Sequence, residues 1–254
     1  MPVWMSTSSS EAAATRLASH VVPALREANR HPRALAALGY ALAALPALLL
    51  AWQTVHGALG INPLEILVRR PGHWALVLLT CVLALTPLRH ALVLLSRRLG
   101  ARWGRRFADW NWLVYLRRPL GLASFVYASA HLALYATLDL DLQWHEFVLD
   151  LDGKPFVLAG LAAFALLVPL AVTSTDAWMR RLKRNWKRLH WLVYPAALLA
   201  ALHFAWLSKP GVPEPYGYGA IILALLAYRV VVRWRPAPGA PAMPEAEAAE
   251  RQPG

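Results

Sequence analysis

The chain has 254 residues, of which 58% are hydrophobic and only 16% are charged, yet its formal net charge is +12. Long apolar segments separated by basic loops are typical of a polytopic membrane protein and exclude an ordinary soluble domain. They also exclude a basic DNA-binding domain, because such a domain does not need about twenty uninterrupted apolar residues. The single cysteine, Cys81, excludes a disulfide framework and a thiolate metal site.

Six apolar segments follow a first stretch, residues 1–33, that we expect to be a cytoplasmic N-terminal extension. Crossing the hydrocarbon core takes about 20 helical residues, and each of the six is long enough. No strand alternation competes with the helical pattern. The sequence therefore predicts an all-α, polytopic membrane helix bundle with six transmembrane helices over residues 34–234, and a disordered cytoplasmic tail over 235–254, where Pro, Ala and Glu dominate. The approximate spans are 34–56, 73–95, 119–138, 155–175, 190–207 and 216–234.

The loop charges predict the orientation. Cytoplasmic loops carry the excess of Lys and Arg, so we expect both basic loops and both termini in the cytoplasm and the acidic loop in the periplasm of a bacterium. The weak pair Arg69–Arg70 on the outer side is the exception. The protein is thus expected to be a multi-pass protein of the inner membrane. The basic loops hold Arg97, Arg98, Arg102, Arg105, Arg106, Arg117 and Arg118, and then Arg180, Arg181, Lys183, Arg184, Lys187 and Arg188; the acidic loop holds Asp139, Asp141, Glu146, Asp150 and Asp152.

Two of the nine histidines, His131 and His203, are predicted to lie deep in the membrane. Ionisable side chains at such depth are expensive and mark functional sites. His131 lies roughly 18 Å above the start of the third span, and His203 about 20 Å above the start of the fifth. Two imidazoles at one depth on separate helices are what a bis-histidine haem requires. The alternative is a structural hydrogen bond to a neighbour such as Ser129 or Tyr194.

His190 begins the same predicted span as His203, on the cytoplasmic side. It suits a second haem or a site where electrons enter. The spacing of thirteen positions from His190 to His203 places the two histidines about 140° apart around an ideal helix, and a kink at Pro195 could change the direction of one ring. His90, near the cytoplasmic end of the second span, is a candidate partner for His190; the alternative is that His90 and Arg89 extend to the lipid headgroups.

Several motifs, in the right order, resemble a known family. Over roughly residues 34–234 the chain is similar to the haem-binding membrane subunit of the bacterial periplasmic methionine sulfoxide reductase system (the MsrQ family), which is of the ferric-reductase-like transmembrane class. The motifs are Thr86-Pro87-Leu88; Arg117-Arg118-Pro119-Leu120-Gly121-Leu122 with Phe125, Tyr127-Ala128 and His131-Leu132; Leu170-Ala171-Val172-Thr173-Ser174-Thr175; and Trp186, Leu189-His190, Val193-Tyr194 and His203-Phe204-Ala205-Trp206.

The resemblance implies a six-span protein that carries heme b, with His131, His190 and His203 as the haem ligands. It also implies FMN as a cofactor and the quinone pool or a cytoplasmic flavin reductase as the electron donor. The acceptor is implied to be a periplasmic molybdopterin subunit, which reduces methionine sulfoxide in oxidised proteins. In the four-histidine pattern of ferric reductases and NADPH oxidases a histidine stands where this chain has Arg118, so the second ligand of a cytoplasmic-side haem is unassigned.

No Gly-rich dinucleotide fingerprint is present, so we expect the electron donor and the catalytic reductase to be separate molecules. The lipid bilayer is a further expected partner, and nucleic acid is excluded. The alternative function is a transporter or an assembly factor without haem, whose intramembrane histidines bind a substrate or relay protons.

Overall fold

The computed structural model describes residues 22–101, 103–209 and 211–234. Within these ranges the chain is helical and contains no strand, so the all-α prediction is confirmed. Six helical segments are long and apolar enough to cross a membrane, as predicted. The predicted tail at 235–254, and residues 1–21 of the predicted extension, lie outside the described residues. The six segments are α2 (Pro32–Val55), α3 (Pro63–Arg98), Phe107–Asp139 including α5 (Arg117–Leu134), α7 (Pro155–Val172), Arg184–Leu207 including α10 (Val193–Leu207), and Glu214–Val232 within α11 (Glu214–Trp234).

Shorter elements interrupt or connect these segments. The third span begins with two short turns and ends in a π-helical turn, while the fifth is broken by a 3-10 turn at His190–Leu192. A ten-residue helix, α6, occupies the loop that the sequence marks as acidic. The connecting elements are η2 (Phe107–Trp110), α4 (Trp112–Tyr115), η3 (Tyr135–Asp139), α6 (Trp144–Gly153), α8 (Asp176–Leu182), α9 (Arg184–Leu189) and η4 (His190–Leu192).

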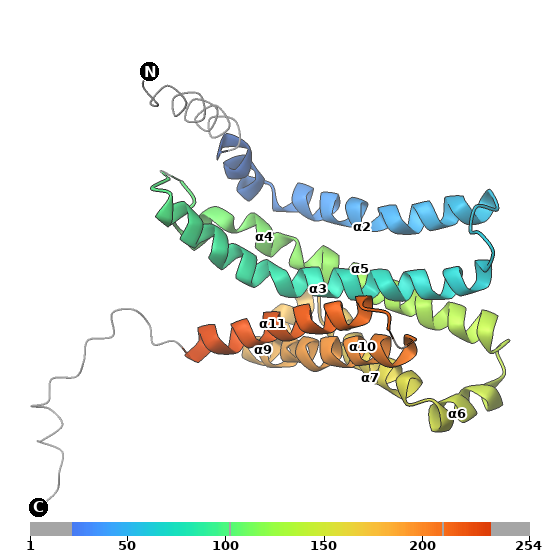
Figure 1. Ribbon diagram of the computed structural model, residues 1–254. Helices are drawn as coiled ribbons and strands as arrows, with labels where there is room; N and C mark the ends of the chain where they lie inside the picture. The colour runs from blue at the N-terminus through green and yellow to red at the C-terminus, as the bar shows by residue number, and fades with distance from the viewer. Residues whose placement is uncertain (1–21, 102, 210, 235–254) are drawn as a thin grey trace, which may run out of the picture.

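The long helix α3 lies at the centre of the bundle (Figure 1). It packs against α5 over much of its length, and α2 contacts both α5 and α3. On the opposite side α11 and α10 contact α3, and α7 packs mainly on α10 and α5. Small residues on α10 let the neighbouring backbones approach closely, which is how membrane helices associate without a hydrophobic driving force. The main core cluster consists of Leu76, Leu79, Leu83, Leu167, Leu170, Ala196, Ala197, Ala201 and Ile222.

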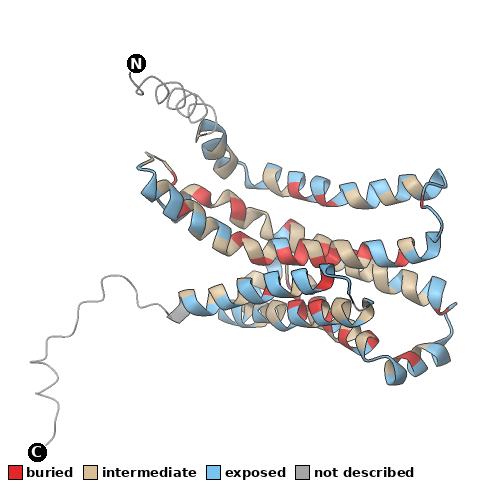
Figure 2. Cartoon of the chain, in the orientation of Figure 1, coloured by how far each residue is buried: buried red, intermediate tan, exposed pale blue. Residues whose placement is uncertain are grey.

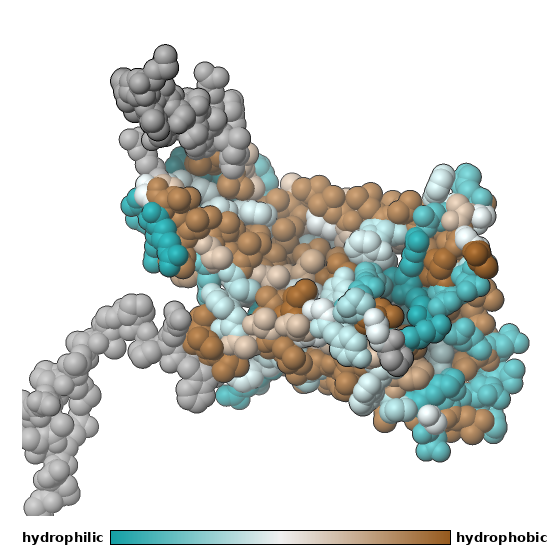
Figure 3. All heavy atoms as spheres, in the orientation of Figure 1, coloured by the Kyte–Doolittle hydropathy of each residue, from teal (hydrophilic) through white to brown (hydrophobic). Residues whose placement is uncertain are grey.

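The face of the bundle seen in Figure 3 is largely apolar between two ends that carry polar residues, and many residues along the outer helices are exposed (Figure 2). On α2, for example, Leu45, Leu48 and Trp52 are all more than half exposed. An exposed apolar surface of this extent is expected to face lipid. We call the end that carries residues 139–154 the acidic end, and the end that carries residues 99–111 and 173–184 the basic end.

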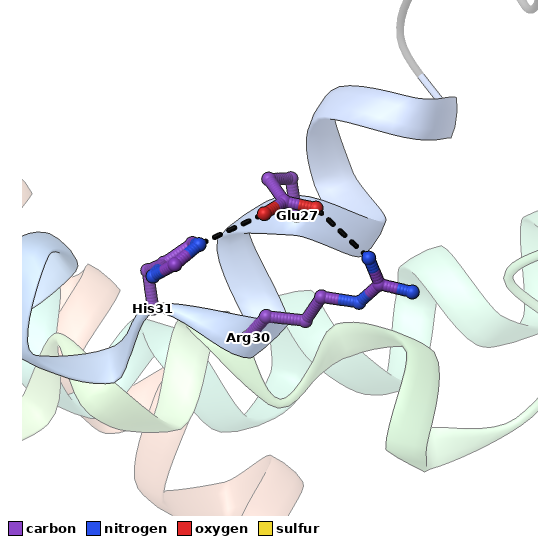
Figure 4. A network of polar contacts seen from close by, with 3 residues as sticks. All are labelled: Glu27, Arg30 and His31. Carbon is purple, nitrogen blue, oxygen red and sulfur yellow. Dashed lines mark hydrogen bonds and ion pairs between the residues drawn. The ribbon is translucent and has the colours of Figure 1, made fainter.

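The described residues before α2 are attached to the basic end. The Asn29 amide donates to the Asp109 carbonyl oxygen over 2.8 Å, and its Oδ1 accepts from the Trp112 backbone N–H over 2.7 Å. Nearby, Glu27 accepts hydrogen bonds from His31 and Arg30 on the surface, at 2.8 and 3.2 Å (Figure 4). The hydrogen bond from His31 lowers the pKa of the Glu27 carboxyl. The two hydrogen bonds of Asn29 therefore connect the residues before the first span to the start of the third span.

Candidate cofactor site between His131 and His203

A cavity of about 900 Å³ opens in the half of the bundle nearer the acidic end. Its deep wall is apolar and includes Leu76, Phe164 and Phe204, whereas charged side chains line its mouth. A volume of this size, with mostly apolar walls and a few polar groups, is typical of a cofactor site. Helices α2, α3, α5, α7 and α10 all contribute to the lining, so the cavity forms only when the bundle is assembled.

His131 from α5 and His203 from α10 lie next to each other in this cavity, with ring centres 6.1 Å apart and ring planes at 66°. The Nδ1 of His131 donates to the Val68 carbonyl oxygen of α3 over 2.7 Å. The Nδ1 of His203 donates to the Phe156 carbonyl oxygen of α7 over 2.6 Å. A carbonyl can only accept, so Nδ1 carries the hydrogen in both rings, and in the neutral form of each ring Nε2 keeps its lone pair. The pair is thus prepared to bind a metal through Nε2.

The spacing of the two rings fits an iron between them. A metal–imidazole bond is about 2 Å long, and the ring centre lies about 1 Å behind the nitrogen, so two imidazoles that bind one metal can have ring centres up to about 6 Å apart. The observed 6.1 Å agrees with this value. The donor set, two neutral imidazoles, also suits haem iron. Among the described residues no cluster of three or more His, Cys, Asp or Glu forms a site for a bare metal ion.

The mouth of the cavity holds both cations and carboxylates, and Arg69 is paired there with Glu65 over 3.1 Å. Arg69, Arg70 and Lys154 all line it. Lys154 Nζ lies 2.6 Å from Asp150 Oδ1, and the Tyr135 hydroxyl donates to Asp150 Oδ2. These two hydrogen bonds, the one from Lys154 first, lower the pKa of the Asp150 carboxyl. This group was not predicted from the sequence, although Lys154 stands alone as a base among the acids of its loop.

His190 lies apart from this pair. It begins the 3-10 turn η4, its ring stacks on Trp186 with centres 3.8 Å apart, and its Nδ1 donates to the Trp186 carbonyl oxygen over 3.1 Å. His190 is absent from the lining of the cavity. The break between His190 and His203 is this 3-10 turn, whereas the sequence analysis considered a kink at Pro195, which lies in the first turn of α10.

The two other residues considered for the cytoplasmic side have different partners. His90 Nδ1 lies 3.0 Å from the Tyr228 hydroxyl, and its ring packs edge-on against Phe107. Among the described ring contacts of His90, none is with His190. Arg118 donates to Asp176 over 2.8 Å at the basic end. The structure therefore brings His131 and His203 together but does not pair His90 with His190.

Comparison with known proteins gives consistent matches. The family described as "Ferric reductase like transmembrane component" matches residues 71–201. The chain is 45% identical over 179 residues to the "Protein-methionine-sulfoxide reductase heme-binding subunit MsrQ" of Xanthomonas axonopodis pv. citri (strain 306), covering 70% of this chain and 75% of that protein. A protein of the same name from Herminiimonas arsenicoxydans is 38% identical over 196 residues, covering 76% and 83% of the two chains.

Proposed function

Because the chain belongs to the MsrQ family of the ferric-reductase-like transmembrane class, we propose that it binds a b-type haem between His131 and His203 and transfers electrons across a membrane. The observation that carries the proposal is the pair of imidazoles 6.1 Å apart, each with Nδ1 bound to a backbone carbonyl. The relatives are named as heme-binding subunits, which supports the same cofactor.

Haem supplies one-electron chemistry at its iron, and this chain supplies the surroundings. His131 and His203 would hold the haem iron, and the apolar wall of the cavity would exclude water and so help to set the reduction potential. Arg69 and Lys154 are paired with Glu65 and Asp150, so Arg70, which donates to the Gln53 amide oxygen, would be the cation at the mouth that binds a carboxylate of the haem. The carbonyl oxygens of Val68 and Phe156 would hold the rings in the tautomer that presents Nε2 to the iron.

We infer the direction of transfer from the charges at the two ends. The basic end is proposed to face the cytoplasm and the acidic end the periplasm of a bacterium with this protein in its inner membrane. The cavity opens toward the acidic end, where the electron acceptor would be a periplasmic molybdopterin methionine sulfoxide reductase subunit that repairs oxidised proteins. The name of the relatives supports a reductase of this substrate. The catalytic reductase would be this separate subunit.

Electrons would enter at the basic end, from the quinone pool or from a cytoplasmic flavin donor. Its surplus of Arg and Lys favours an anionic flavin such as FMN, or an acidic protein partner. We propose His190 as a separate ligand position on this side, for a second haem or for the incoming electron. Its place outside the cavity of His131 and His203 supports a distinct role.

The test is the reduced-minus-oxidised absorption spectrum of the purified protein in detergent, with haem counted per chain by pyridine haemochrome. His131→Ala and His203→Ala should each remove the same haem, because either change leaves the iron with one axial ligand. His190→Ala should retain that haem. Wild-type protein without a haem spectrum, from cells that make ample haem, would contradict the proposal.

A further inference from the structure

We propose that Gly72 and Gly160 are positioning residues, each of which lets one axial imidazole lie against the backbone of the neighbouring helix. Gly72 lies on α3 opposite His131, and Gly160 lies on α7 opposite His203. The proposal rests on the proposed haem site and adds two residues that do not touch the iron. What points to them is a contact that repeats on two helices.

On α7, the His203 ring occupies the space that a side chain at position 160 would need. A Cβ atom on Gly160 would lie 2.7 Å from His203 Nδ1 and 2.9 Å from its Cε1. Carbon atoms do not approach ring atoms this closely, since optimal contacts begin at about 3.5 Å. Any residue larger than glycine at this position must therefore push the His203 ring away.

On α3, the His131 ring lies over Gly72 in the same manner. A Cβ atom on Gly72 would lie 3.1 Å from both Cγ and Nδ1 of His131. This contact is also tight, but it is looser than the one at Gly160. A shift of the ring by a few tenths of an ångström would relieve it. The two glycines should thus differ in how much a methyl group disturbs the site.

The carbonyl that each ring binds lies one helical turn before the glycine. Val68 precedes Gly72 by four residues, and Phe156 precedes Gly160 by four. In an α-helix the carbonyl of residue i accepts from the N–H of residue i+4, so this oxygen is the one offered to the glycine's own N–H. Its second lone pair remains for the imidazole. The missing side chain at the glycine gives the ring access to that lone pair.

This arrangement controls both the direction and the basicity of the proposed ligands. A hydrogen bond from Nδ1 fixes the tautomer and the ring orientation and raises the basicity of Nε2, and loss of such a partner typically costs 10–100-fold in metal affinity. A methyl group on Gly160 would separate His203 from the Phe156 carbonyl oxygen. Less basic ligands favour the ferrous over the ferric ion, so the reduction potential should rise as well.

The experiment compares Gly160→Ala, Gly72→Ala and Gly121→Ala with the wild type. Gly121 lies on α5, the helix of His131, and a Cβ atom there would meet nothing within 4 Å, so Gly121→Ala is the matched control. Haem affinity is measured by titration of haem into the apoprotein. The electron paramagnetic resonance spectrum and the midpoint potential report on the axial ligands, and thermal unfolding of the apoproteins reports on the bundle.

We expect Gly160→Ala to bind haem at least tenfold more weakly, with a changed electron paramagnetic resonance spectrum and a higher midpoint potential. Gly72→Ala should show smaller changes of the same kind. Gly121→Ala should resemble the wild type. Equal effects of all three, or a wild-type spectrum and potential in Gly160→Ala, would overturn the role of the glycines while leaving the haem proposal intact. Wild-type protein without haem would instead overturn the proposed function.

A second pair of variants keeps the test decisive if Gly160→Ala folds poorly. His203→Gly should lose the haem, and imidazole added together with haem can replace the missing side chain, so the return of the haem absorption reports imidazole binding. Adding Gly160→Ala to this variant should weaken imidazole binding at least tenfold, because the methyl group occupies the place of the ring. Unchanged imidazole binding would refute a direct contact between position 160 and the axial ligand.

Discussion

Pro87 and Arg229 offer a quantitative test of how this bundle is held together. Pro87 lies inside α3 and has no backbone N–H, so the Leu83 carbonyl, one turn earlier, loses its partner within the helix. Arg229 of α11 replaces that partner, because its Nη2 donates to the Leu83 oxygen over 2.9 Å. Its Nη1 donates to the Tyr194 hydroxyl of α10 over 3.0 Å. The Arg229 guanidinium thus joins α11, α10 and α3 at the carbonyl that Pro87 leaves without a partner in α3.

Removing the guanidinium by Arg229→Ala leaves the Leu83 carbonyl without a donor. Leu83 is only 1% exposed, so water does not easily replace it. A buried unsatisfied acceptor costs about 1–3 kcal/mol, and an average hydrogen bond between membrane helices contributes about 0.6 kcal/mol. Taking about 1.4 kcal/mol for the carbonyl and about 0.6 kcal/mol for the Tyr194 contact, we expect a loss of about 2 kcal/mol. For a chain of this length that corresponds to a fall in Tm of about 4–8 °C.

The partner variant Pro87→Ala restores an N–H that can satisfy Leu83 within α3. In that background Arg229→Ala should cost only about 0.6 kcal/mol, since the Tyr194 contact alone is lost. Unfolding in detergent, followed by tryptophan fluorescence, measures the four members of this double-mutant cycle. Arg118→Ala is the matched control, because its ion pair with Asp176 is exposed and should contribute less than about 1 kcal/mol. Equal losses from Arg229→Ala in both backgrounds would refute the reasoning.

Three further outcomes follow from other contacts. The Tyr127 hydroxyl donates to the Ala43 carbonyl oxygen and accepts from the Ala47 N–H. Tyr127→Phe should therefore destabilise the packing of α2 by about 1 kcal/mol and speed hydrogen exchange at the Ala47 amide. Unchanged exchange at Ala47 would contradict this role. The pKa of Asp150 is lowered in the folded protein, so the carboxylate stabilises the fold above its unfolded pKa near 3.8, and this stabilisation is lost as the pH falls below that value. Asp150→Asn should therefore lose less Tm than the wild type between pH 5 and pH 3. An identical acid profile of the two proteins would contradict this role. Gly104 has φ +88°, and a Cβ atom there would lie 2.6 Å from the Ser96 side-chain oxygen. Gly104→Ala should therefore lower the free energy of unfolding by more than about 1 kcal/mol, which is roughly the cost of a left-handed backbone for a residue with a side chain. A smaller loss would show that the loop relaxes around the new methyl group.

The number and approximate position of the membrane spans could be predicted because they depend on local composition. A segment must be long enough and apolar enough to cross the hydrocarbon core, and both properties are read from consecutive residues. The internal breaks were not predicted. The π-helical turn at Tyr135–Asp139 and the 3-10 turn at His190–Leu192 depend on contacts with other segments, such as the hydrogen bond from Tyr135 to Asp150 and the stacking of His190 on Trp186.

The sequence by itself determined the depth of the histidines, since depth increases by 1.5 Å with every helical residue. This was enough to predict that His131 and His203 share a layer and that His190 belongs to another. Depth does not determine the direction in which a ring points or what it meets there. Only the packing of α5 on α3 and of α10 on α7 placed Gly72 and Gly160 beside the two rings and offered them the Val68 and Phe156 carbonyls. The rotation of one helix against another is set by side chains far apart in the chain, so the tertiary structure decided which histidines meet and how each is held.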